Sequence, residues 1–258
     1  MKTFNGDFDK FLNKLKNKEH FSYSKYSDGE LFILQGKELI LGPNPQQHSY
    51  QNSEDFKHFD PNQHNFFKDM LFEAFKFNHP NYYIGICAPP GYDDNTFFWM
   101  KKESEKDEEH LTWANLFVNS NYKRFREEFV PELKNNKIII TCNEKSNLDL
   151  LPFSVVKDFR VGQNCIINNI NLVDTIIDYV KENKIKNHVF LFAASSLGNI
   201  MINKLTNFEP ENTYIDVGST LNPLLGLSID RGYLCAYEGV LWRGSDTSSD
   251  LTLYEFWK

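Results

Sequence analysis

Two acidic residues separated by a single glycine, Asp28 and Glu30, are the first candidates for chemistry in this sequence. They follow a strand-like run, and Gly29 lets the backbone bend so that both carboxylates could turn toward one hard divalent cation. Such a pair typically holds Mg²⁺ or Mn²⁺ against a diphosphate. The same three residues also suit an ordinary helix start, with Asp as the cap and Glu completing a capping pattern. By itself the short motif favours the helix start.

A second candidate is the run from Ala193 to Asn199, which follows an apolar strand-like segment and opens a helical pattern. Such a turn presents free backbone N–H groups, together with the hydroxyls of Ser195 and Ser196, at the positive end of a helix dipole, where anions bind. The run matches neither a Walker A loop nor G-x-G-x-x-G, and Ser195 lacks the G-x-S-x-G context of hydrolases. An anion site and a serine-capped helix start fit it equally well.

A third acid, Asp216, ends the next strand-like segment and shortly precedes Gly218. It could contact a sugar hydroxyl or act as a base, although a strand-end cap is the simpler interpretation. Amides and a tyrosine also suit sugar recognition, which makes Asn119, Asn121 and Tyr122 candidate sugar contacts. A turn between two helices explains those three residues equally well.

Composition and charge narrow the class of protein. The chain has 258 residues, of which 41% are hydrophobic and 24% charged, and its net charge is −7. These values exclude disordered and fibrous chains, and the 23 Phe and 12 Tyr mainly indicate a large core. Without a dense Lys/Arg run we expect no nucleic-acid binding, because neutralising many phosphates needs clustered cations.

The four cysteines and the apolar runs indicate the compartment. The cysteines are widely spaced, without C-x-x-C or zinc-finger spacing, and the longest apolar run, 189–194, is too short to span a bilayer. The N-terminus lacks the apolar stretch of a signal peptide. We therefore expect a cytoplasmic protein without a transmembrane segment.

The elements that must position these residues alternate between strand and helix patterns. Strands are expected at 21–26, 82–87, 137–142, 189–194 and 213–217, and residues 46–60 are expected to form a loop. Helices are expected at 8–15, 60–75, 110–118, 122–134, 172–180 and 197–205. Strand–helix–strand spacing implies right-handed crossovers and a parallel sheet. We predict one doubly wound α/β domain over residues 1–258, with a mostly parallel sheet, helices on both faces and a helical insertion near 95–135.

The stretch Lys25-Tyr26-Ser27-Asp28-Gly29-Glu30-Leu31 resembles an Arg-aromatic-Gly-Asp-Gly-Glu-Phe signature found near the N-terminus of a known family. Looser matches follow at 194–198, a small-residue turn after a strand, and at 216–218, an Asp-hydrophobic-Gly element. In these features the chain is similar to the GT-D-type glycosyltransferases, bacterial enzymes that extend surface glycans. Lys25 and Ser27 replace the family's Arg and Gly, and Ser219 replaces a His.

The resemblance implies a Rossmann-related fold and a metal-dependent glycosyltransferase that moves a sugar from a nucleotide-diphosphate sugar to a glycan acceptor. It implies that Asp28 and Glu30 hold Mn²⁺ or Mg²⁺ at the diphosphate, and Asp216 is the candidate sugar contact or base. Aromatic rings at Tyr26 and Tyr122 could stack on a nucleobase or sugar. The expected substrate contacts are Lys25, Tyr26, Gly29, Asn119, Asn121, Tyr122, Ser195, Ser196, Gly198 and Gly218. Peripheral association with a membrane-bound acceptor is compatible with this function.

Two other functions use the same residues. A metal-dependent phosphoesterase acting on a nucleotide or sugar phosphate would use the acids to activate water, but it would normally need more His or Asp ligands than this sequence groups together. A non-catalytic nucleotide-sugar-binding protein would explain why Lys25, Ser27 and Ser219 depart from the family pattern.

Overall fold

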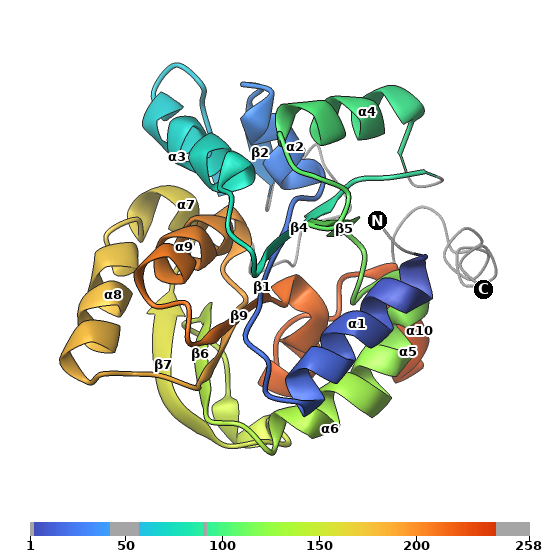
Figure 1. The fold of residues 1–258 in the computed structure, drawn as a ribbon, viewed down its shortest axis with the longest axis vertical. Coiled ribbons are helices and arrows are strands. Elements are labelled where there is room, and N and C mark those ends of the chain that lie inside the picture. The colour runs from blue at the N-terminus through green and yellow to red at the C-terminus, as the bar shows by residue number, and fades with distance from the viewer. Residues whose placement is uncertain (1–2, 42–56, 90–91, 241–258) are drawn as a thin grey trace.

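The computed structural model describes residues 3–41, 57–89 and 92–240. Its main sheet has seven parallel strands in the order β5-β4-β1-β9-β8-β6-β7, and helices cover both faces (Figure 1). The strands of this sheet are β1 (Ser22–Lys25), β4 (Tyr82–Ile86), β5 (Leu111–Trp113), β6 (Ile138–Asn143), β7 (Val155–Val161), β8 (Val189–Phe192) and β9 (Thr213–Asp216). A separate antiparallel pair consists of β2 (Leu39–Leu41) and β3 (Lys57–Phe59). The predicted α/β class with a parallel sheet is confirmed.

The helices differ widely in length. The longer ones are α1 (Phe4–Lys16), α2 (Asp28–Leu34), α3 (Asn65–Lys76), α4 (Asp94–Glu103), α8 (Leu172–Glu182), α9 (Ser195–Phe208) and α10 (Gly232–Glu238). Short helical turns are η2 (Asn119–Asn121), α5 (Tyr122–Arg124), η3 (Phe125–Phe129), α6 (Val130–Leu133), η4 (Leu148–Leu150), α7 (Cys165–Asn168) and η5 (Gly218–Leu225). In the described ranges, no helix is both long and apolar enough to cross a membrane.

Alternate side chains of the strands pack into two hydrophobic clusters, one on each face of the sheet. In β8, Phe190 and Phe192 join the cluster under α3, α8 and α9, whereas Val189 and Leu191 join the cluster under α1, α6 and α10. This two-residue alternation is what a strand covered on both faces requires. Much of the aromatic content lies in these clusters and fills the core, as expected.

The structure differs from the predicted elements in several segments. Residues 110–118, predicted as helix, contain the edge strand β5, which is hydrogen-bonded to β4. β7 is not among the predicted strands, and β3 occupies the described end of the expected loop at 46–60. The helix expected from Asp60 begins at Asn65, because the Asp60 carboxylate accepts hydrogen bonds from the Asn62 N–H and the Gln63 amide and stabilises a turn first. The segment near 95–135 holds α4 and the turns from η2 to α6 as well as β5.

Candidate active site

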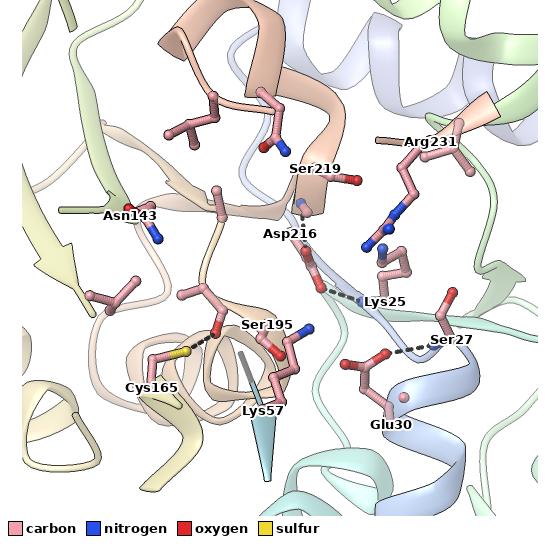
Figure 2. Close-up of a pocket in the computed structure, with 18 of the residues that line it drawn as sticks. Lys25, Ser27, Glu30, Lys57, Asn143, Cys165, Ser195, Asp216, Ser219 and Arg231 are labelled. Carbon is pink, nitrogen blue, oxygen red and sulfur yellow. Dashed lines mark hydrogen bonds between the residues drawn. The ribbon is translucent and has the colours of Figure 1, made fainter. Parts of the chain in front are cut away.

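A cleft of about 290 Å³ opens at the carboxyl ends of the parallel strands (Figure 2). Lys25 is the last residue of β1, Asp216 the last of β9 and Asn143 the last of β6, and all three line the cleft. Ser195 lines it from the first turn of α9, directly after β8. In open α/β sheets ligands bind at this edge, so the geometry makes the cleft the candidate active site.

Glu30 connects the start of α2 to α9. Its carboxylate accepts one hydrogen bond from the Ser27 backbone N–H at 3.0 Å and another from the Ser196 hydroxyl at 2.7 Å. The first of these belongs to a capping box, and Glu30 is only 7% exposed. The predicted helix start is therefore present, with Glu30 in its capping role, but the cap is Ser27 and not Asp28, which is the first residue of the helix. Both Glu30 and Ser196 serve to hold two helices together.

A second buried contact fixes α9 against the end of β1. The Asn199 side-chain amide donates to the Ser24 hydroxyl at 2.9 Å and to the Lys25 carbonyl at 2.7 Å. These bonds lock the first turns of α9 beside the last residues of β1, where the cleft opens. Asn199 ends the candidate anion-binding run 193–199, but its positioning role depends on the β1–α9 contact, which the sequence does not reveal.

Asp216 lies on the floor of the cleft and is 6% exposed. Its carboxylate accepts hydrogen bonds from the Gly218 N–H at 2.9 Å and the Lys25 N–H at 3.3 Å. Burial raises the pKa of Asp216 to about 6, while the positive charge of Lys25 opposes this rise and the negative charge of Glu30 adds to it. A carboxylate with such a pKa is mostly ionised at neutral pH and can still accept a proton.

Three cationic side chains line the cleft from separate elements. Lys25 comes from β1, Lys57 from β3 and Arg231 from the residue that precedes α10 (Figure 2). Of these three, only Lys25 is expected from the sequence. Lys57 and Arg231 are isolated cations in the sequence, with no motif around them, and only the fold brings them to the same cleft.

The expected metal site can be tested on the arrangement of its two acids. Asp28 and Glu30 are the first and third residues of one helix, and side chains two positions apart on a helix point in different directions. Asp28 is exposed, whereas Glu30 is buried and hydrogen-bonded. Among the described residues there is no group of three or more His, Cys, Asp or Glu that could hold a metal. The residues therefore fit Mn²⁺ or Mg²⁺ only as a cation shared with substrate phosphates.

The two tyrosines expected to stack on the substrate lie in the core. Tyr26 is fully buried, with its ring 4.8 Å from that of Phe75. Tyr122 is also fully buried, its ring packs on Tyr233 at 4.9 Å, and its hydroxyl donates to the Thr220 carbonyl. Both interpretations are corrected, because neither ring face is open to a ligand.

Four further predicted contacts do not line the cleft. Asn121 is buried and donates to the Leu116 carbonyl, which stabilises its own turn, and Asn119 lies in the same turn. Gly198 is buried within α9, where an added Cβ would lie 3.3 Å from the Phe192 Cβ, so it allows close packing of the helix on β8. Ser196 is engaged with Glu30, as described above. The predicted site residues that the structure brings together in the cleft are Lys25, Asp28, Gly29, Glu30, Ser195, Asp216 and Gly218.

Comparison with known proteins finds two solved structures with a similar fold. No family model matches the sequence, and no curated protein matches it either. Two solved structures are similar over 96% of this chain and 87% of theirs, each with a TM-score of 0.50. One, 16% identical, is a selenomethionine-substituted structure of the domain of unknown function 1792. The other, 15% identical, is described as showing that this highly conserved domain "has a distinct glycosyltransferase fold". At this identity the likeness concerns the fold alone.

Proposed function

We propose that this chain is a glycosyltransferase that moves a sugar from a nucleotide-diphosphate sugar to a glycan acceptor. The observation that carries the proposal is the composition of the cleft, in which exposed and buried carboxylates lie together with three cations at the carboxyl ends of parallel strands. The similarity to a domain described as having a glycosyltransferase fold supports it.

The donor diphosphate is assigned to the part of the cleft between α2 and the end of β9. Lys25 and Arg231 supply positive charge there, and Gly29 and Gly218 leave room for the phosphates. Asp28 is the residue that would hold Mn²⁺ or Mg²⁺ together with phosphate oxygens, and the cation, when bound, stabilises the charge of the departing diphosphate. Glu30 keeps the start of α2 in position through its bonds to Ser27 and Ser196.

Asp216 is assigned as the proton acceptor. The acceptor hydroxyl must lose a proton when its oxygen bonds to the sugar, and a carboxylate in the cleft can take that proton. Its pKa of about 6 leaves Asp216 ionised at neutral pH but more basic than an exposed aspartate. Its bonds to the Gly218 and Lys25 N–H groups fix the direction of the carboxylate.

A donor panel tests the proposal. Incubated with Mn²⁺ and individual nucleotide sugars, the protein should show a raised melting temperature with its donor and should release nucleoside diphosphate, slowly without acceptor. Release of nucleoside diphosphate should be lost in Asp28→Ala, and the rise in melting temperature should be smaller in this variant. Both effects should be kept in Asp149→Ala, which removes an exposed carboxylate outside the cleft. Release of inorganic phosphate would support a phosphoesterase instead, and a shift without turnover would support a binding protein. If no nucleotide sugar shifts the melting temperature, the proposal is wrong.

A further inference from the structure

Ser195 and Lys57 mark a part of the cleft that the roles above leave unused. The Ser195 hydroxyl is buried and has no hydrogen-bond partner among the described residues. Lys57 lines the same cleft from β3, and its side chain extends toward Ser195 (Figure 2). A buried hydroxyl without a partner costs free energy, and an anionic oxygen bound there would accept its hydrogen bond and be attracted by the positive charge of the Lys57 ammonium group.

The start of α9 adds to this position. Ser195 is the first residue of a helix of 14 residues, whose free N–H groups and dipole favour a negative charge at this end. Its backbone is left-handed, with a φ of 52°, which is unusual for a residue other than glycine. A cation, an unpartnered hydroxyl and a helix N-terminus thus occur together in one cleft.

The position of Lys57 depends on Asn164. The Asn164 side chain accepts a hydrogen bond from the His58 N–H at 3.0 Å and donates to the His58 carbonyl at 3.3 Å. One amide therefore binds both backbone groups of the residue next to Lys57. This contact ties β3 to the turn before α7, on the wall of the cleft that carries Gly162 and Cys165.

We propose that Lys57, Ser195 and the N-terminus of α9 form a binding position for a phosphate group, and that Asn164 is the positioning residue that holds Lys57 there. The natural occupant is one phosphate of the donor diphosphate, while the other phosphate lies near Lys25 and Arg231, and this assignment rests on the proposed function. Since the charge comes from the chain itself, the position binds a diphosphate without a divalent cation.

Calorimetric titration with inorganic pyrophosphate in the presence of EDTA tests the site. The wild type should bind, and Lys57→Gln should weaken binding about tenfold or more, as expected for a charge-assisted contact. Ser195→Ala should weaken it about two- to tenfold. The matched control is Lys37→Gln, which removes an exposed lysine just before β2, outside the cleft, and should leave the affinity unchanged.

Asn164→Gly tests the positioning role. Asn164 has a φ of 49°, so glycine keeps the backbone conformation and removes only the amide. Its melting curve should stay cooperative, while its pyrophosphate affinity falls toward that of Lys57→Gln. The double variant should bind no more weakly than Lys57→Gln alone, because Asn164 acts through Lys57.

The results separate this inference from the proposed function. Equal binding by the wild type and Lys57→Gln, no binding by the wild type in EDTA, or fully additive losses in the double variant would each overturn the inference. If pyrophosphate binding depends on Lys57 but no nucleotide sugar supports sugar transfer, the phosphate-binding inference holds and the proposed glycosyltransferase function is wrong. If the protein transfers a sugar but binds pyrophosphate independently of Lys57, the proposed function holds and the phosphate-binding inference is wrong.

Discussion

Asp216 combines burial with a carboxyl group, so its ionisation should affect the stability of the fold. Its pKa is raised from an ordinary value of 3.8 to about 6, chiefly by loss of contact with water. Between these two values the folded protein keeps a proton that the unfolded chain has lost. The stabilisation of the folded state by protonated Asp216 is therefore complete below about pH 3.8 and is lost as the pH rises through about 6.

Asp216→Asn, which cannot ionise, should lack this pH dependence. From about pH 4 to about pH 7 the free energy of unfolding of the wild type should fall relative to the variant by on the order of 2–3 kcal/mol. Urea unfolding of both proteins across this range measures the difference. Parallel stability curves would show that Asp216 titrates alike in the folded and unfolded states.

The two acids of the Asp-Gly-Glu motif should differ in what they contribute. Glu30→Ala removes a capping contact and leaves the buried Ser196 hydroxyl without its acceptor, so the free energy of unfolding should fall by about 2–4 kcal/mol. Asp28→Ala removes an exposed side chain and should change it by less than about 0.5 kcal/mol. Denaturant unfolding tests this contrast, and equal losses in both variants would contradict the separation of roles.

At the scale of elements, the turn between β9 and η5 leaves the space that the Lys25 side chain occupies. Gly218 begins η5 with a φ of 49°, and an added Cβ would lie 2.9 Å from the Lys25 Nζ. Gly218→Ala should lower the free energy of unfolding by about 1–2 kcal/mol, because alanine is strained in this conformation. It should also displace the Lys25 ammonium group and weaken pyrophosphate binding.

Gly239→Ala is the control for this turn. Gly239 also has a positive φ, 67°, but an added Cβ there meets no atom of the described residues within 4 Å. Its substitution should therefore cost similar stability and leave the pyrophosphate affinity unchanged. Melting temperature and calorimetric titration of both variants provide the two readouts. Equal losses of affinity would mean that the effect comes from general destabilisation, not from Lys25.

The sequence predicted the central elements and missed those at the margins. β4, β6, β8 and β9 are short apolar runs buried on both faces, so their composition marks them as strands of a parallel sheet. β7 is an edge strand in which Val156 and Lys157 are exposed and Asp158 and Arg160 are half-buried, and β5 is a three-residue edge strand whose surroundings also suit a helix. Whether such a segment forms a strand depends on its pairing with a neighbouring strand, and the local sequence does not show that pairing.

For the site too, the sequence predicts some residues correctly and others wrongly. Asp28, Ser195 and Asp216 could be found because each lies where a strand gives way to a turn or helix, and such places in a parallel sheet share one edge. Tyr26 and Tyr122 were assigned to the substrate because they neighbour polar motifs, but their rings point into the core. Sequence adjacency does not determine the direction of a side chain.

For the whole molecule, the distribution of charge decides which anions can bind. The net charge is −7, so the surface as a whole repels anions. In the cleft, by contrast, Lys25, Lys57 and Arg231 balance the carboxylates of Asp28, Glu30 and Asp216, and their cationic groups attract an anion at short range. At physiological salt, charges interact over about 8 Å, which confines this attraction to the cleft itself. A small anion that enters the cleft is attracted by these cationic groups, whereas a polyanion lying on the surface is mostly repelled by the acidic surface.

The protein should therefore bind pyrophosphate but not an oligonucleotide. Binding a nucleic acid depends on many phosphates meeting cations spread over a surface, and a cleft of about 290 Å³ admits only a small part of such a chain. Fluorescence anisotropy of a labelled single-stranded oligonucleotide at physiological salt should show no binding at protein concentrations that saturate with pyrophosphate. Salt-sensitive binding with a slope equivalent to several phosphates would contradict this, because it would require a cationic surface outside the cleft.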